Sequence, residues 1–572
     1  MSQLLHAPGF AALDGGRAVE TRLIGGRWQA VAWEPAADRR RVLTDLPHGV
    51  DLSEIEPDGG HVWWFDADTG GAGRWRRQPF TAGPAAEALT GLPRGRAYGL
   101  AFDRSGATAA LALGVGDTTL LYAGAPGGPA RLLGTAPGYL GLADLSPDGA
   151  LLALAGRPDG PDAVLLRPAD PAGEPLTLPG GPGLRLWPIE FHPETGELLL
   201  VTARGEHYGV ATWRPGRGLR HHPGLGFASE ITVGWYGGGR GVLVQHEHAG
   251  RSRLLRAELD GPPPEPVPLP GGTVHDLSCA PDGTLHCLWS REAVPPRTLA
   301  FRPGGPPADP APHRPGGVRR TERWTERPYG RVHSFLATPD GPGPWPTLFL
   351  VHGGPATHDR DSYDPTVDTL VRAGHAVVRT NYRGSTGYGA RWQHDWGHRV
   401  GLAQAEDLAA VRAALVAEGV AEAGRTGLCG ISWGGYLTLL ALGLHPDLWS
   451  LGMAVHPIAD YPAAYRATTP ALRATDRQLF GGTPEQVPER YRRASPLTYV
   501  ERVRAPVLLV ASRTDERCPA EQVERYARAL GGVGAPHELV WVDGGHRSRR
   551  AGDHASVLAA QLRFARRVWR SP

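Results

Sequence analysis

A single serine, Ser432, lies among glycines in the segment GLCGISWGGY, residues 427–436. A serine hydroxyl becomes a useful nucleophile only when the backbone exposes it and a neighbouring base takes its proton. The stretch Gly430-Ile-Ser-Trp-Gly434 fits the pattern G-x-S-x-G, in which small residues flank a serine on a tight strand-to-helix turn. Because the chain has 79 glycines, this pattern alone is weak evidence, and the partners of Ser432 decide its meaning.

The chain contains no lysine, so a Ser-Lys dyad, a Schiff-base lysine and a Walker A loop are all excluded. Histidine must therefore activate the serine. Asp515 follows the apolar run 507–511, and His546 follows the run 537–542. The order serine, acid, histidine is that of α/β-hydrolases, and the carboxyl ends of parallel strands are where a doubly wound sheet binds its ligands. Ser432, Asp515 and His546 are thus the predicted triad.

Three other residues compete for these roles. Asp543 precedes a Gly-Gly pair and is interpreted as a turn former, and Glu516 is interpreted as a solvated neighbour of Asp515. His352 precedes the serine, which is the wrong chain order for the base, so we interpret it as a residue that orients a loop.

An oxyanion needs two backbone donors, one from the residue after the nucleophile and one from a loop after an early strand. The N–H of Trp433 is the first candidate. The second is the N–H of Gly354, in the segment Val351-His-Gly-Gly-Pro355 at the end of a predicted strand.

The C-terminal half alternates short apolar runs with helical patterns, as α/β proteins do. Runs at 347–351 and 376–380 predict buried strands, and 402–419 predicts a helix with Leu408, Val411 and Leu415 on one face. We therefore predict an α/β-hydrolase domain with a mostly parallel, doubly wound sheet over residues 316–572. A Pro/Gly-rich linker, residues 302–317, precedes it.

The N-terminal half repeats a turn dipeptide followed by a short apolar strand. Successive turns begin 43 to 47 residues apart: Asp14-Gly15, Asp58-Gly59, Ser105-Gly106, Asp148-Gly149, Thr195-Gly196, Gly238-Gly239 and Asp282-Gly283. Repeats of this length with several strands each are typical of β-propeller blades. We predict a seven-bladed β-propeller over residues 1–315, with the first few residues packing on the hydrolase domain. A pair of β-sandwiches is the alternative, and the glycine-only turn at 238 is the weakest signal.

The bulk composition limits the partners. The formal net charge is +2, and no basic block is interleaved with aromatic residues, so we expect neither a nucleic acid nor a membrane surface as a partner. The N-terminus lacks the basic and apolar regions of a secretory signal, and no run approaches about 18 apolar residues. The sequence therefore predicts a cytoplasmic protein.

No metal or other cofactor is predicted. The four cysteines lack the paired C-x-x-C spacing of a zinc site. The histidine pairs His246/His248 and His221/His222 have no third ligand at a sensible spacing, and we interpret both as strand or loop surface.

Five segments carry a family resemblance: HGGP (352–355), NYRGSTGYG (381–389), GISWGGY (430–436), SRTDERCP (512–519) and DGGH (543–546). Together, behind a predicted propeller, they resemble the prolyl oligopeptidase family of serine peptidases, and most closely its acylaminoacyl-peptidase branch. The acid loop of that family reads G-x-x-D-x-x-V-P, whereas Ser512 and Cys518 replace the glycine and the valine here. Both are small, so we expect the loop to be kept. The segment RSRR after His546 is interpreted as a solvated loop, or as a bias toward acidic substrates.

The resemblance implies a serine peptidase that hydrolyses short peptides through an acyl-enzyme, with the propeller restricting entry to unstructured chains. Ser432 would be the nucleophile, His546 the general base and Asp515 its orienting acid, with Gly354 and Trp433 as oxyanion donors. Part of the family's first specificity pocket lies in residues 457–500. Its candidate walls for an apolar side chain, which are equally interpretable as packing residues, are Tyr461, Tyr465 and Phe480.

Two other functions stay open. The same triad could hydrolyse esters or transfer an acyl group to an amine, because nothing in it distinguishes water from another nucleophile. The substrate class is accordingly a short peptide or a small acyl-amide or ester. The other reading is a propeller binding protein with an inactive hydrolase half. Homo-oligomer formation is compatible with the sequence.

Overall fold

The chain forms two compact units in the computed structural model, which describes residues 4–156, 163–180, 183–302, 304–305, 318–546 and 551–570. The first unit comprises Met1–Arg291 and Pro296–Ala311, and the second comprises Glu292–Pro295 and Pro312–Pro572. Most of the Pro/Gly-rich segment, the predicted boundary between 315 and 316, and the RSRR segment lie outside the described residues.

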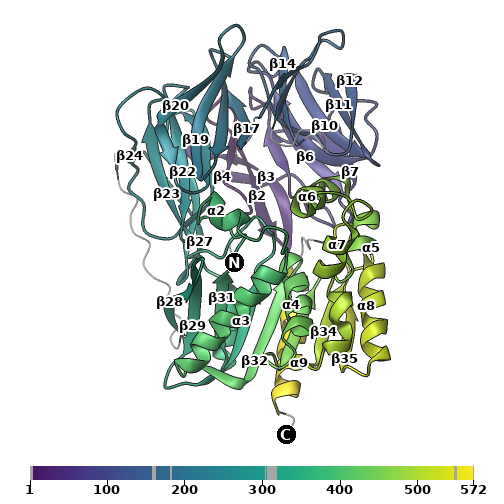
Figure 1. Cartoon of the computed structure of the whole chain (residues 1–572). Helices are drawn as coiled ribbons and strands as arrows, with labels where there is room; N and C mark the ends of the chain where they lie inside the picture. Colours follow the sequence, from purple (N-terminus) through teal and green to yellow (C-terminus); the bar gives the residue numbers. More distant parts are fainter. Residues whose placement is uncertain are drawn as a thin grey trace. The chain divides into compact units, whose positions relative to one another are not determined.

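Within the described residues, the first unit holds seven small antiparallel sheets (Figure 1). Six have four strands and the last has three: β1–β4 (residues 9–42), β5–β8 (53–87), β9–β12 (96–137), β13–β16 (141–178), β17–β20 (184–227), β21–β24 (231–266) and β25–β27 (273–301). Buried aliphatic and aromatic side chains from consecutive sheets form shared cores. The predicted seven-bladed β-propeller is thereby confirmed.

Every predicted turn joins the first and second strands of a sheet. Asp58-Gly59, for example, lies between β5 (Ser53–Ile55) and β6 (His61–Ala67), and Gly59 has φ +71°. The glycine-only turn, the weakest of the seven signals, lies in the same place, between β21 (Ile231–Tyr236) and β22 (Gly241–His248). The period therefore reflects one hairpin turn per blade.

The first and last blades meet through non-covalent contacts. The backbone N–H of Ala7 donates to Asp276 Oδ2 at 2.8 Å, and the rings of Phe10 and His286 lie 4.7 Å apart. At the N-terminal end of the described chain, Leu4 pairs with Arg22 of β2 (Ala18–Ile24). Residues 4–10 thus belong to the first blade.

One interpretation of the propeller histidines is wrong. His222, on β20 of the fifth blade, is only 3% exposed; it hydrogen-bonds Thr212 Oγ1, and its Nδ1 lies 3.1 Å from Oδ1 of Asp260 in the sixth blade. It is a buried structural residue and not part of the surface. His246 hydrogen-bonds Ser229 Oγ at 2.8 Å.

The second unit is built on an eight-stranded sheet with the order β28-β29-β31-β30-β32-β33-β34-β35. The first two pairings are antiparallel, and all pairings from β31 to β35 are parallel. The strands are β28 (Val318–Arg327), β29 (Gly330–Pro339), β30 (Trp345–Val351), β31 (Ala376–Asn381), β32 (Ala421–Ile431), β33 (Leu451–Val455), β34 (Val507–Ala511) and β35 (His537–Trp541).

Helices cover both faces of this sheet. The helices are α1 (Pro365–Arg372), α2 (Ala390–His394), α3 (Leu402–Ala417), α4 (Trp433–Leu444), α5 (Tyr461–Ala467), α6 (Pro470–Phe480), α7 (Pro488–Ala494), α8 (Ala520–Gly532) and α9 (Ala551–Arg570). One core holds buried residues of α3, α4 and α8, and a separate core holds those of α1 and α9. Leu408, Val411 and Leu415 are buried as predicted. This is the predicted doubly wound α/β-hydrolase sheet.

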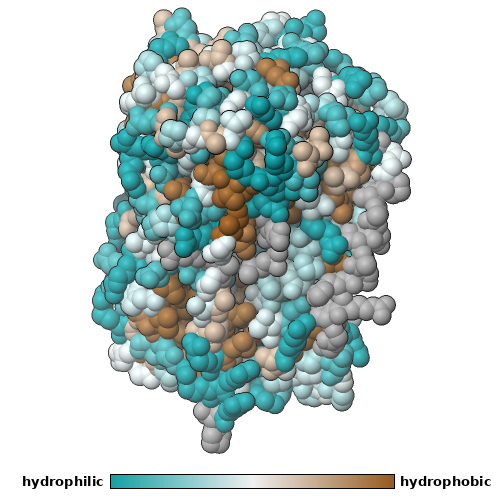
Figure 2. Space-filling view, turned by 180° about the vertical axis from the view of Figure 1, so that it is seen from behind, coloured by the Kyte–Doolittle hydropathy of each residue, from teal (hydrophilic) through white to brown (hydrophobic). Residues whose placement is uncertain are grey.

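Hydrophilic side chains cover most of the face drawn in Figure 2, and hydrophobic residues gather there in small groups. Among the described helices, none combines the length and the apolar composition needed to cross a bilayer.

Candidate active site

Ser432 lies on the sharp turn between β32 and α4, with φ 57° and ψ −118°. A non-glycine residue rarely has such a backbone conformation, and strain of this kind collects at functional sites. The flanking glycines are required by close backbone contacts. A Cβ on Gly430 would lie 2.2 Å from the carbonyl oxygen of Gly434, and one on Gly434 would lie 1.9 Å from that of Val351. The sequence pattern therefore reflects a turn that leaves no room for side chains.

The structure brings together the three predicted triad residues. His546 Nε2 lies 2.9 Å from Ser432 Oγ, and His546 Nδ1 lies 2.9 Å from Asp515 Oδ2. Ser432 follows β32, Asp515 follows β34 and His546 follows β35, so all three come from carboxyl ends of parallel strands. This geometry matches a nucleophile, a base and an orienting acid.

The environment keeps the acid ionised and the base neutral. Burial alone would raise the pKa of Asp515, but the neighbouring His456 and His546 outweigh it and hold that pKa well below its usual range. Burial lowers the pKa of His546 from its ordinary 6.5, against the opposing effect of Asp515. A neutral imidazole beside an ionised carboxylate is the state that can accept a proton from serine.

A second histidine touches the acid, and we did not predict it. His456 follows β33, is 7% exposed and has φ 47°. Its Nδ1 lies 3.1 Å from Asp515 Oδ2, and its ring centroid lies 5.6 Å from that of His546. Because β33 lies between β32 and β34 in the sheet, the residue after it is placed between Ser432 and Asp515.

Both candidate oxyanion donors lie at the expected ends of secondary structure. Trp433 is the first residue of α4, where a backbone N–H has no carbonyl one turn earlier to bond. Gly354 follows β30 with φ +137°, and a Cβ on its neighbour Gly353 would lie 3.8 Å from Ser432 Cβ. The oxyanion roles of Trp433 and Gly354 stay a prediction.

His352 orients the Gly353-Gly354 loop, in line with its interpretation from the sequence. Its ring stacks on Tyr382 with centroids 4.2 Å apart, and its Nε2 hydrogen-bonds Ser385 Oγ at 2.9 Å. Burial lowers the pKa of His352 to about 4, so it is a neutral hydrogen-bonding residue at physiological pH.

The loop that holds His352 is itself anchored by a buried ion pair. Asp407, on α3 and 0% exposed, accepts hydrogen bonds from the backbone N–H and the guanidinium of Arg383 at 2.9 and 3.0 Å. Arg383 lies between Tyr382 and Ser385, the two residues that contact His352. Asp407 thus fixes the loop beside the candidate oxyanion site.

Asp407→Ala is expected to lower the free energy of unfolding by about 3–5 kcal/mol, because it leaves the Arg383 guanidinium buried without its partner. Urea denaturation of the purified variant measures this loss. Glu418→Ala, at the exposed end of the same helix, is the control and should change stability by less than about 1 kcal/mol. Equal stability of the two variants would contradict the anchoring role.

The candidate pocket residues Tyr461, Tyr465 and Phe480 are 0%, 8% and 2% exposed. The rings of Tyr461 and Phe480 lie 5.0 Å apart, and Phe480 lies 4.1 Å from Tyr491 of α7. The structure therefore gathers them in one buried aromatic group, which also fits their interpretation as packing residues.

Cys518 belongs to the same site. Its side chain lies beside Ser432, and its Sγ lies within 4.8 Å of donor atoms of Asp515 and His546. Three such donors could hold a metal ion, but an ion there would displace the hydrogen bond between Asp515 and His546. The donor set therefore fits the triad better than a metal site.

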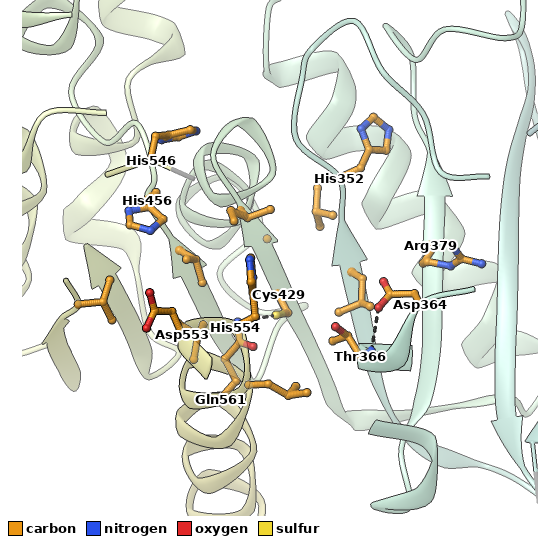
Figure 3. Close-up of a pocket in the computed structure, with 18 of the residues that line it drawn as sticks. His352, Asp364, Thr366, Arg379, Cys429, His456, His546, Asp553, His554 and Gln561 are labelled. Carbon is orange, nitrogen blue, oxygen red and sulfur yellow. Dashed lines mark hydrogen bonds between the residues drawn. The ribbon is translucent and has the colours of Figure 1, made fainter. Parts of the chain in front are cut away.

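A cavity of about 390 Å³ lies beside His546, on the α1 and α9 face of the sheet. Figure 3 shows His456 and His546 on one side of it and Asp364 and Arg379 on the other. Gln561 of α9 donates to Cys429 Sγ at 3.1 Å. The candidate base thus has open space next to it on the face opposite α4.

Comparison with known proteins agrees with this geometry. A profile of the prolyl oligopeptidase family matches residues 361–571, which include Ser432, Asp515 and His546. The hydrolase part of the chain is therefore similar to the prolyl oligopeptidase family. Acylamino-acid-releasing enzyme 2 of Oryza sativa subsp. japonica is 28% identical over 195 residues, 32% of this chain and 25% of that protein. Dipeptidyl peptidase family member 6 of Caenorhabditis elegans is 28% identical over 235 residues, 39% of this chain and 30% of that protein.

These matches span a third or less of each of the two relatives, whereas solved structures of similar fold match nearly the whole chain. A puromycin-hydrolyzing peptidase of Mycobacterium tuberculosis superposes with a TM-score of 0.82 at 20% identity, covering 99% of this chain and 94% of that one. An acylaminoacyl peptidase of Pyrococcus horikoshii gives 0.72 at 17% identity, covering 97% and 93%. At these identities the likeness establishes the two-domain fold alone.

Proposed function

We propose that this protein is a serine peptidase that hydrolyses short peptides through an acyl-enzyme, in the manner of an acylaminoacyl-peptidase or an aminopeptidase. The observation that carries the proposal is the hydrogen-bonded series Ser432–His546–Asp515, with both contacts at 2.9 Å, on a strained turn. The acylamino-acid-releasing and dipeptidyl peptidase relatives support the peptide class of substrate.

In the proposed reaction, Ser432 Oγ attacks the carbonyl carbon while His546 Nε2 takes its proton. The oxyanion is stabilised by the N–H groups of Trp433 and Gly354. His546 then gives the proton to the leaving amine, and Asp515 holds the imidazole in the required tautomer throughout. A water molecule, activated in the same way, hydrolyses the acyl-enzyme.

The reactivity of Ser432 is expected to fall on the acid side with a midpoint below pH 6.5, because burial lowers the pKa of His546 and only the neutral imidazole accepts the proton. Asp515 stays ionised over this range. The charged and titratable groups that act on His546 are Asp515, Arg517 and His456. The measurement is the second-order rate of labelling by a small uncharged fluorophosphonate between pH 4.5 and 8. A midpoint above pH 7 would contradict the assignment of the base.

A substrate panel tests the function itself. Blocked and unblocked amino-acid p-nitroanilides should be hydrolysed, together with the matching p-nitrophenyl esters. Turnover of esters without amides would indicate an esterase, and product formation that depends on an added amine would indicate acyl transfer. If fluorophosphonate fails to label the protein, the reading as a propeller binding protein gains support and the peptidase proposal fails.

We also propose a cytoplasmic location. All four cysteines are free thiols, and three of them are buried. Free cysteines in this number suit a reducing compartment, because oxidising ones favour disulfides. Cell fractionation with an antibody against the protein tests this location.

A further inference from the structure

Two buried polar groups in α5 and α6 have no partner among the described residues. Asp476 of α6 is 8% exposed, and burial raises the pKa of its carboxylate to about 7. The hydroxyl of Tyr461 in α5 is fully buried and accepts or donates no hydrogen bond there. Nearly all buried polar groups in folded proteins are hydrogen-bonded, and an unpaired buried carboxylate is especially unfavourable. Both groups therefore call for an explanation.

Asp476 and Tyr461 both lie against the same group of buried aromatic rings. Asp476 and Phe480 are four residues apart on α6 and so share a helix face. The Phe480 ring lies 5.0 Å from that of Tyr461, which in turn lies 5.0 Å from that of Tyr436 on α4. Burial raises the pKa values of Tyr436 and Tyr461, and the carboxylate of Asp476 raises both further. We call Tyr436, Tyr461, Phe480 and Tyr491 the aromatic cluster; Asp476 lies against it.

The aromatic cluster is adjacent to the nucleophile. Tyr436 lies one helical turn after Ser432 on α4. Cys518, which lies beside Ser432, is close enough to Asp476 for that carboxylate to raise the pKa of the thiol, although burial is the larger cause. The α5–α6 turn also rests on the acid loop, because Thr468 Oγ1 donates to the carbonyl oxygen of Arg517 at 2.9 Å. Asp476 therefore belongs to the group of side chains that packs around the turn holding Ser432.

We propose that Asp476 and Tyr461 recognise a cationic nitrogen on the acyl part of the substrate. An ammonium or guanidinium group supplies both the charge and the hydrogen-bond donors that Asp476 lacks, and the surrounding rings add cation–π attraction. Arg477, the nearest basic neighbour on the helix, reaches Tyr465 Oη at 3.4 Å. The proposal rests on the proposed function, since Ser432 defines which part of the substrate is the acyl part.

Two sources of the cation share this chemistry. One is a lysine or arginine side chain on the residue whose carbonyl is attacked, and the other is the free α-amino group of that residue. Tyr461 and Tyr491 are fully buried, so either group enters by displacing aromatic rings. The carboxylate at the end of the aromatic cluster changes the apolar specificity expected from Tyr461, Tyr465 and Phe480 into a cationic one.

The test compares kcat/KM for matched pairs of p-nitroanilides. N-acetyl-lysine is paired with N-acetyl-norleucine, N-acetyl-arginine with N-acetyl-citrulline, and free alanine with N-acetyl-alanine. The wild-type enzyme should prefer the cationic member of at least one pair by ~10-fold or more, the size expected for a hydrogen-bonded charge. The side-chain pairs and the alanine pair identify which source of the cation is used.

Asp476→Asn is expected to remove that preference while leaving the neutral substrates within about two-fold of wild type. Tyr461→Phe should reduce it by a smaller factor, because only one hydroxyl is lost. Asp447→Asn is the matched control: its carboxylate is 73% exposed and pairs with Arg504. Circular dichroism and fluorophosphonate labelling verify that each variant is folded.

The pH dependence of the preference for cationic over neutral substrates distinguishes recognition from packing. If Asp476 had only a structural role, this ratio of kcat/KM values would not change with pH. Burial raises the pKa of Asp476 to about 7, so the cationic preference should grow as the pH rises from 6 to 8. The titratable groups that face it are the thiol of Cys518 and the hydroxyls of Tyr436, Tyr461 and Tyr491. All four have raised pKa values and stay uncharged over this range.

Two outcomes overturn the inference while the peptidase proposal stands: equal hydrolysis of cationic and neutral substrates by the wild-type enzyme, or a cationic preference that persists in Asp476→Asn. If no p-nitroanilide is hydrolysed and fluorophosphonate does not label Ser432, the peptidase proposal has failed, and this inference with it.

Discussion

Ser432→Ala is expected to abolish turnover of every substrate, with kcat falling by about 10⁶-fold, as when the nucleophilic serine of a catalytic triad is removed. The methyl group cannot form an acyl-enzyme, and His546 loses the hydroxyl that lies 2.9 Å from its Nε2. The variant should also resist fluorophosphonate. Stopped assays at high enzyme concentration, with p-nitroanilides as substrates, measure the residual rate.

Ser450→Ala is the matched control for this experiment. Ser450 lies just before β33, at the end of the strand far from Ser432, and donates to the carbonyl oxygen of Thr426 at 2.9 Å. Its removal should leave kcat within about two-fold of wild type. A Ser432→Ala enzyme that keeps a tenth or more of the wild-type rate would refute the role of this serine.

The fold was predictable because its signals are local. A blade needs a turn where β-strands reverse, and in most of the blades a glycine supplies the positive φ of that turn, so the turn is recognisable in the sequence. Gly59, with φ +71°, is one such position. The buried strands of the parallel sheet were equally visible, since both of their faces are covered and they read as continuous apolar runs, of which Val507–Ala511 is one.

The triad was predictable because chain order and strand ends restrict it. By the same rule His456 could have been found, since it directly follows the apolar strand Leu451–Val455, as Asp515 and His546 come soon after theirs. The sequence alone does not give the order of the strands in the sheet, and the role of His456 depends on that order. Only the placement of β33 between β32 and β34 makes the residue after it a neighbour of Asp515.

The position of Asp476 could not be predicted in this way. Asp476 lies in a helical excursion between β33 and β34, where no sheet register fixes its position. Its helix carries two arginines, and its sequence is typical of a solvated amphipathic segment. The burial of one carboxylate on that helix, and its closeness to Cys518, follow from tertiary packing alone.

Asp515→Asn is expected to lower kcat by about 10⁴-fold while the fold persists, because an amide cannot hold the imidazole in the required tautomer or stabilise its protonated form. The carboxylate accepts from His546 and from the backbone N–H groups of Arg517 and Cys518, at 2.9 and 2.8 Å. Asparagine keeps an oxygen for the two backbone donors, so circular dichroism should be unchanged. The loss should therefore appear in kcat rather than in stability.

Variants of the two neighbouring carboxylates, Asp543 and Glu516, test whether Asp515 is the acid of the triad. Asp543→Asn and Glu516→Gln change exposed residues beside the base and the acid, and each should keep kcat within about three-fold of wild type. A 10⁴-fold loss in Asp543→Asn, with activity retained in Asp515→Asn, would transfer the role of the acid to Asp543. That outcome would require His546 to turn away from Asp515 Oδ2, which lies 2.9 Å from its Nδ1. The strong lowering of the Asp515 pKa by His456 and His546 argues against such a rotation.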